Sequence, residues 1–472
     1  MSITQLLHTA KSSLLAYRAA MNTVGQNVAN AESEGYSRRM TTLSAQNVAP
    51  QGRITRGTIN TFSGTGVKVE SYERMRDELL DRTAWHSNGF MGASEEEHRV
   101  VAALESIFAV QTEGSLTNQL DRFFNAWSDL ADNPTDNGVR LALRSRGAAL
   151  AGTLNRMSAD VNHLEAESKR ALAGHVDDAN KMFAEIAELN AKVTRGRYLG
   201  KPDHVAEDRR GLLVNKLSEM GTFRVHEQEN GSFSVTLDGM NLVSEQRAQT
   251  LSIDNSGVTP EIKIAGTNVS MGVPPEGGGK LAGLLRGLQT TLPDTLARLD
   301  SIAETIVKEV NAIHTTGFDL DGNTNVDFFH YAAGPPEEGI KATSITLSNA
   351  VKANSRAIVA SQGDPSLGVN DSGVANDILA LRENTVMNGN TETVETFVIN
   401  MVSGIGAVAE RAGNLYESHA AFSNHVQAMA EGVSGVSLEE EMTSLIEFQQ
   451  AFSASARVIT AAEEMMDTLL AL

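Results

Sequence analysis

The stretch SLEEEMTSLIEFQQAFSASARVITAAEEMMDTLLAL, residues 437–472, repeats its apolar side chains every seven residues. This spacing is typical of a long helix that packs against other helices. Ser437 and Glu440 form a capping box, so the helix should begin here, and no Gly or Pro interrupts it. The main row contains Leu438, Leu445, Phe452, Ile459 and Met466, and Phe448, Ala462 and Leu469 lie on the adjoining row.

The first thirty residues repeat this design, opened by a second capping pair, Ser2 and Gln5. One helix cannot bury its own apolar stripe, and a fully buried apolar side chain is worth roughly 1.5–3 kcal/mol. The two terminal helices should therefore pair with each other, with a neighbouring subunit or with both. The alternative is that both pack on one globular core. The N-terminal rows are Leu7, Leu14, Met21 and Val28 on one side, and Ile3, Ala10, Tyr17 and Val24 on the other.

We call the predicted contact set on these two helices the assembly seam. It consists of Ile3, Leu7, Leu14, Tyr17, Met21, Val24, Val28, Leu438, Leu445, Phe448, Phe452, Ile459, Met466 and Leu469.

The length and composition of the chain limit the possible classes of protein. A chain of 472 residues should divide into two to four domains. The net charge of −20, from 39 basic and 59 acidic residues, argues against nucleic acid or an anionic membrane as the main partner. The chain has no cysteine, which excludes disulfides and thiolate metal sites. Lys11 and Arg18 interrupt the apolar residues of the N-terminus, so we expect no cleaved secretory signal. No uninterrupted apolar run approaches the ~18 residues that a spanning helix needs, so we expect no membrane insertion.

The pattern along the chain predicts a mainly α protein with an inserted β domain. Residues 1–35 and 436–472 should form a terminal unit of coiled-coil-type helices, paired N to C. Residues 36–220 and 276–435 should form a helical middle domain, with small extended segments near 37–72 and an irregular region at 318–375. Residues 221–275 alternate around Asn230-Gly231, a strong hairpin signal, and should form an outer β-rich domain. Turns are expected at NGFMGAS, residues 88–94, and at DNPTDNG, residues 132–138.

A search for chemistry finds no catalytic pattern, and we expect neither an enzyme nor a cofactor. The best metal candidate is the run of oxygen-bearing side chains Asp319, Asp321, Asn323, Asn325 and Asp327. Thr324 and His330 stand where a calcium loop requires glycine and glutamate, so a polar turn capped by its own side chains is the preferred interpretation.

The stretch QNVANAESEGYSRR, residues 26–39, resembles the N-terminal motif of the axial proteins of the bacterial flagellum. The C-terminal stretch and three internal stretches, beginning at Ser115, Glu207 and Asn311, are similar to the hook-associated branch of that family. The chain is short after Phe329, so the extra outer β domain of larger members is missing or reduced to residues 330–375. The matching motif residues are Asn27, Asn30, Gly35, Tyr36, Ser37 and Arg38.

This resemblance implies a structural subunit that forms a ring at the junction between hook and filament. The implied partners are other copies of the chain, hook protein below and hook-associated protein 3 above, and a cytoplasmic export chaperone on the C-terminal helix. The implied location is the flagellum, reached by flagellar type III export. Two alternatives are another axial subunit (hook, distal rod or hook-associated protein 3) and, less favoured, a secreted injectisome effector.

Overall fold

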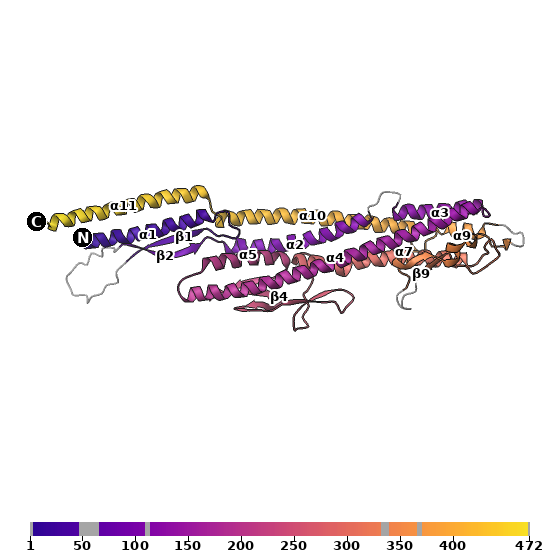
Figure 1. The fold of residues 1–472 in the computed structure, drawn as a ribbon, viewed down its shortest axis with the longest axis horizontal. Coiled ribbons are helices and arrows are strands. Elements are labelled where there is room, and N and C mark those ends of the chain that lie inside the picture. Colours follow the sequence, from indigo (N-terminus) through magenta and orange to yellow (C-terminus); the bar gives the residue numbers. More distant parts are fainter. Residues whose placement is uncertain (1–2, 47–65, 109–113, 332–338, 366–370, 471–472) are drawn as a thin grey trace.

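The structure is a computed structural model that describes residues 3–46, 66–108, 114–331, 339–365 and 371–470. The described chain forms a long rod whose two termini lie at the same end (Figure 1). At that end, α1 (Ile3–Ala29) and α11 (Leu438–Leu470) lie side by side and run in opposite directions. The predicted fold class is confirmed: the chain is mainly helical, its long terminal helices are paired, and its sheets are small and antiparallel.

Long helices form the shaft of the rod. Helix α2 (Glu78–Phe108) packs along α10 (Val394–Ser434), and α4 (Asn137–Tyr198) contacts α2, α3 (Leu116–Asp132) and α5 (His204–Met220). Helix α4 has 62 residues, which is about 90 Å at 1.5 Å per residue. Helix α6 (Gly279–Arg286) continues through a π-helical turn, η1 (Gly287–Thr291), into α7 (Leu292–His314).

The turn predicted at residues 88–94 is wrong, because this stretch lies inside α2. Its small residues allow other segments to approach closely. A Cβ atom added to Gly92 would lie 2.3 Å from the backbone oxygen of Glu219, and one added to Gly283 of α6 would lie 2.3 Å from that of Ala93. Helix packing at these points therefore uses glycine where the sequence pattern suggested a break. The turn at residues 132–138 is confirmed between α3 and α4.

The β-rich part lies along one side of α4 (Figure 1). The hairpin predicted around Asn230-Gly231 is confirmed, with Gly231 at φ +82° and Val225 opposite Val235. Two asparagine side chains of α4 bind the backbone of the strands. Asn190 bonds to the backbone N–H and oxygen of Phe233, and Asn180 bonds in the same way to Leu251. The strands are β3 (Arg224–Glu227), β4 (Phe233–Leu237), β5 (Met240–Ser244) and β6 (Arg247–Ala248) in one sheet, and β7 (Leu251–Asp254) and β8 (Glu261–Ile264) in another.

The end of the rod far from the termini contains the irregular segments at residues 318–331, 339–365 and 371–375 (Figure 1). They pack on an aromatic cluster formed by Phe123, Trp127, Phe328 and Phe329. The elements are β9 (Phe329–Tyr331), η2 (Ala342–Ser344), β10 (Ile345–Leu347), α8 (Asn349–Ala353), η3 (Ser355–Ala357) and α9 (Gly373–Ala380).

His314 lies beside this cluster and is completely buried. Its Nδ1–H donates to the backbone oxygen of Val326, and its Nε2 accepts the N–H of Val359 at 2.9 Å. Burial lowers the pKa of His314 to about 4, although the bond to Val326 acts in the opposite direction. The neutral ring therefore joins α7 to two irregular segments.

We expect the free energy of unfolding to fall as the pH drops from about 6.5 towards 4. A histidine whose folded pKa is depressed gives its full stabilisation above its unfolded pKa and loses it as protons bind the unfolded chain. The slope from this one group is at most about 1.4 kcal/mol per pH unit. Denaturant unfolding of wild type and His314→Gln at several pH values checks this, because glutamine cannot titrate. The exposed His163→Gln serves as control, and equal pH slopes for wild type and His314→Gln would contradict the assignment.

Candidate assembly site

The paired terminal helices bring the two halves of the assembly seam together. The rings of Tyr17 and Phe448 lie 6.4 Å apart, and Ala10 and Ala462 are buried. Val24 is buried, whereas Val28, Leu438 and Leu469 keep 37, 54 and 61% of their surface exposed. The remaining seam residues are half-buried: Ile3, Leu7, Leu14, Tyr17, Met21, Leu445, Phe448, Phe452, Ile459 and Met466.

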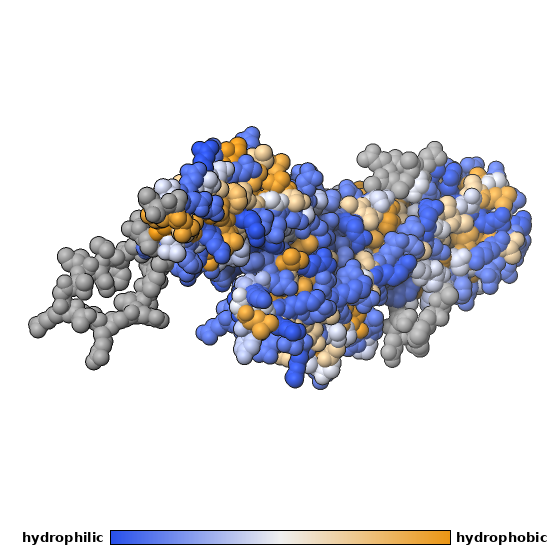
Figure 2. Space-filling model, turned by 60° about the vertical axis from the view of Figure 1, so that its left-hand side comes forward, coloured by the Kyte–Doolittle hydropathy of each residue, from blue (hydrophilic) through white to orange (hydrophobic). Residues whose placement is uncertain are grey.

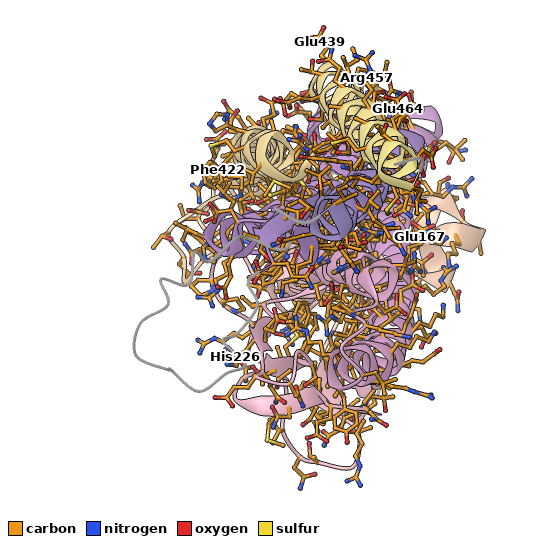
Figure 3. The ribbon with its side chains drawn as sticks, turned by 90° about the vertical axis from the view of Figure 1, so that its left-hand side faces the viewer. Glu167, His226, Phe422, Glu439, Arg457 and Glu464 are labelled. Carbon is orange, nitrogen blue, oxygen red and sulfur yellow. The ribbon has the colours of Figure 1, made fainter. Side chains whose placement is uncertain are left out.

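Pairing with α1 leaves much of α11 uncovered. Of the described residues of α11, only Glu441 and Ala462 are buried. Glu439, Arg457 and Glu464 project from this helix away from the body of the molecule (Figure 3). Apolar side chains gather on the exposed surface of this end (Figure 2). Those on α11 outside the seam are Met442, Ile446, Val458, Met465 and Leu470.

A second face of α1 packs on the hairpin of β1 (Arg39–Ala45) and β2 (Val67–Arg74), the extended segments expected near residues 37–72. This face is made of small residues, including the buried Ala16 and Ala20. Ser12 Oγ accepts the N–H of Val67 at 3.2 Å, and the hydroxyls of Thr41 and Thr23 bond at 2.8 Å. The seam face and the hairpin face together fix the rotation of α1.

The motif residue Asn27 lies at the centre of the joint between the terminal helices and the shaft. Its amide nitrogen donates to the backbone oxygen of Arg39 and to Glu441 Oε2, both at 2.9 Å. Its Oδ1 accepts the Tyr36 hydroxyl at 2.8 Å and the N–H of Arg39 at 3.0 Å. All four hydrogen-bonding positions of this buried amide are therefore used, so Asn27 ties the end of α1 to the start of α11.

Gly35 and Tyr36 shape the loop that leaves α1. Gly35 has φ +79°, and a Cβ atom there would lie 2.9 Å from Leu212 Cβ of α5, so both conformation and space require glycine. Burial raises the pKa of Tyr36, which keeps its hydroxyl a donor to Asn27. Ser37 is buried, whereas the Asn30 side chain bonds to nearby residues, donating to the backbone oxygen of Gln26 at 2.8 Å and accepting the Ser33 hydroxyl at 3.5 Å.

Arg38 spans the joint from the other side. Its N–H donates to the backbone oxygen of Ser434 at 2.8 Å, at the end of α10. Its guanidinium bonds Glu441 Oε1 and Glu440 Oε2, each at 2.7 Å. The Glu441 side chain is only 2% exposed, whereas that of Glu440 is 63% exposed. The break between α10 and α11 is thus held at a defined place by the backbone bond from Arg38 to Ser434 and by an ion pair whose carboxylate, Glu441, is buried.

A second group of ion pairs fastens the hairpin to α5. The Asp208 carboxylate forms ion pairs with Arg39 at 2.9 Å and with Arg74 at 3.0 Å. Arg74 also forms an ion pair with Glu207 at 3.2 Å. Burial alone would raise the pKa of Glu207, but the hydrogen bond from His204 and the charge of Arg74 lower it to about 2. The Glu207 carboxylate therefore stays ionised across the physiological pH range.

The sequence pattern did not point to Glu441, Asp208, Glu207, Arg39 or Arg74 as joint residues. The only available signal was the acidic run at residues 439–441, which also suits the first turn of a helix. We use the name joint for these residues together with Asn27, Tyr36 and Arg38.

The candidate calcium loop is a self-capped turn. Asp319 Oδ1 accepts the N–H groups of Asp321 and Asn323, both at 2.8 Å, and Asp321 pairs with Arg356 at 2.6 Å. Within the described residues, no group of three or more His, Cys, Asp and Glu side chains could hold a metal ion. No helix in that part of the chain is both long and apolar enough to span a bilayer.

Comparison with known proteins gives the same assignment along the whole chain. Residues 101–329 match the model of the flagellar hook-associated protein FlgK helical domain, and residues 427–472 match that of the flagellar basal body rod FlgEFG protein C-terminal. Flagellar hook-associated protein 1 of Bacillus subtilis is 27% identical over 98% of this chain and 97% of that protein. This chain is therefore similar, along almost its whole length, to flagellar hook-associated protein 1. The corresponding protein of Salmonella typhimurium is 25% identical over 99% of this chain and all of that protein.

A solved structure has the same fold. It is the flagellar hook junction protein FlgK from Burkholderia pseudomallei, with a TM-score of 0.64 and 17% identity, over 75% of this chain and all of that one. The family predicted from residues 26–39 and from the C-terminal stretch is therefore confirmed. These relatives carry the names of structural flagellar components, not of enzymes.

Proposed function

We infer that this chain is a structural subunit of the bacterial flagellum that forms the junction between hook and filament. The observation that carries this function is the terminal pair, whose C-terminal helix is covered on one side by α1 and is otherwise largely open. A helix with so much uncovered apolar surface requires further partners. The relatives named above are hook-associated proteins, which supports placing those partners in the flagellar axis.

We further propose the binding partners of the chain and the way in which it is exported. Copies of the chain pack through their paired terminal helices into a ring, with hook protein on one side and hook-associated protein 3 on the other. Residues 1–35 with 436–472 form the assembly unit, residues 36–220 with 276–435 the middle domain, and residues 221–275 the outward β domain. A cytoplasmic chaperone covers the C-terminal helix before flagellar type III export. The uncovered apolar residues of α11 support this step, since they need shielding in the cytoplasm.

Deletion of the gene in its own bacterium tests the function. We expect hooks without filaments and flagellin lost to the medium, because filament subunits would lack a base on which to assemble. A plasmid copy of the wild-type gene should restore filaments. Normal filaments on the deletion strain would contradict the junction function.

A further inference from the structure

The long helix α10 carries a band of exposed residues that the described part of the chain leaves uncovered. Its inner face packs on α2 through contacts such as the 2.8 Å bond from Ser423 Oγ to Asn88 Oδ1. On the outside, a row of large apolar residues recurs every seven positions, and Phe422 of this row points away from the body of the molecule (Figure 3). The row is Val408, Leu415, Phe422 and Met429, with 40, 40, 52 and 41% of their surfaces exposed.

Two further rows complete this band, and both contain mainly small residues. One is Gly404, Arg411, Ser418, His425 and Gly432, and the other is Ala407, Asn414, Ala421 and Ala428, all of them exposed. Large side chains beside short ones at a heptad spacing are the surface into which a second helix fits its own side chains. The shape of the band therefore favours a helix as its occupant.

A groove at the start of the band is mainly apolar, although Asp294 and Arg298 also line it. Its volume is about 320 Å³, and it opens beside Gly404 and Val408, between α10, α2, the π-helical turn η1 and the start of α7. Gly404 contributes no side chain to this groove, and Leu104 and Ile405 line it. The groove could receive a bulky apolar side chain from the docking helix.

The charge of the band points to a second copy of the chain as the partner. None of the three rows contains a carboxylate, although the chain has 59 acidic residues and a net charge of −20. Two such chains repel each other, so their contact is favoured where acidic groups are absent. Arg411 is the lone arginine or lysine in the band, and it can pair with a carboxylate of the acidic partner. The acidic row Glu410, Glu417 and Glu431 lies directly beside the band and marks its edge.

We propose that this band of α10 binds a helix of the neighbouring copy in the junction ring. The proposal rests on the proposed function, and it adds a contact on the shaft to the one at the terminal seam. A ring needs a heterologous interface, in which one surface of a subunit meets a different surface of the next. The band supplies one of these two surfaces.

A matched pair of charge substitutions on one helix tests the effect on assembly. Phe422→Glu places a carboxylate in the band, whereas Asn424→Glu extends the neighbouring acidic row by the same charge. In the deletion strain, we expect Phe422→Glu to leave at least tenfold fewer cells with filaments than the wild-type gene, and Asn424→Glu to match wild type. Circular dichroism of the purified chains should show the same melting curve for both. Filaments at wild-type frequency with Phe422→Glu would overturn the proposal that the band binds a neighbouring copy. The junction function would still be supported by the phenotype of the deletion strain.

Crosslinking identifies the occupant without disturbing the fold. Because the chain has no cysteine, Met429→Cys places a single reactive thiol in the band, and a benzophenone maleimide can be attached there. Irradiation of isolated hook–filament structures should give a product of twice the 50.5 kDa mass of the chain. Glu167→Cys, on the other side of the rod, is the control (Figure 3). A product with a different flagellar protein, or equal yields from both positions, would overturn the assignment.

Discussion

Replacing Glu441 by glutamine should release the terminal helices from the shaft and abolish filament growth. Glu441 is almost completely buried and accepts bonds from Arg38 Nε at 2.7 Å and from Asn27 Nδ2 at 2.9 Å. Each hydrogen bond that involves a charged group contributes about 1.5–3 kcal/mol. The glutamine side chain has one oxygen, so one of the two donors would face an NH₂ group and lose its partner. We therefore expect the substitution to lower the free energy that stabilises the joint by about 3 kcal/mol.

Two backbone amides report directly on the joint. The N–H of Arg38 donates to the backbone oxygen of Ser434, and the N–H of Arg39 donates to Asn27 Oδ1. A loss of about 3 kcal/mol should speed their hydrogen exchange by roughly a hundredfold, since 1.4 kcal/mol corresponds to a factor of ten. Exchange in the middle of α4 should stay unchanged, because Glu441 accepts its bonds from Asn27 and Arg38, which lie outside that helix.

The neighbouring residue Glu440 provides the matched control. It also pairs with Arg38 at 2.7 Å, but its side chain is 63% exposed. Exposed ion pairs contribute about 0–1 kcal/mol, so Glu440→Gln should change exchange at the same amides less than about fivefold and leave filaments intact. Equal effects of the two substitutions would show that the buried position of Glu441 has no special importance.

The terminal helices could be predicted because a seven-residue spacing reports directly which face of a helix is apolar. Phe452 and Tyr17 needed no knowledge of their partners to be placed on a contact face. The hairpin at Asn230-Gly231 was predictable for the same reason, since its turn chemistry is local. Both signals lie within a few residues of the structure that they predict.

The ion pairs of the joint could not be predicted, because they connect residues that are far apart in the sequence. Arg38 and Glu441 are separated by 403 positions, and each has an ordinary local explanation as a loop cation or a helix-start carboxylate. At residues 88–94, the glycines led to the prediction of a turn where the chain forms a helix. Gly92 weakens an isolated helix by about 1 kcal/mol, but tertiary packing on α5 and α6 holds α2 together, and only glycine fits there.

Replacing Phe452 by aspartate should abolish filaments while leaving the shaft folded. Phe452 is a half-buried member of the seam between α11 and α1, four residues after Phe448, which contacts Tyr17. A carboxylate placed there loses hydration without gaining a partner, at a cost of several kcal/mol. In a ring, every copy carries the same defect in its own α1–α11 pair, so the costs add over all copies. We expect Leu445→Asp to have the same effect.

A substitution at the next residue along α11 shows whether the effect depends on the seam position or on any added charge on this helix. Ser453 is exposed on the outer side of α11, so Ser453→Asp should keep far more filaments than Phe452→Asp. Electron microscopy of cells that carry each variant in the deletion strain gives the filament count. Circular dichroism should show that Phe452→Asp keeps the unfolding transition of the shaft helices, since α2, α4 and α10 lie outside this seam. Wild-type motility with Phe452→Asp would refute the packing argument, because no ring could bury that many charges without cost.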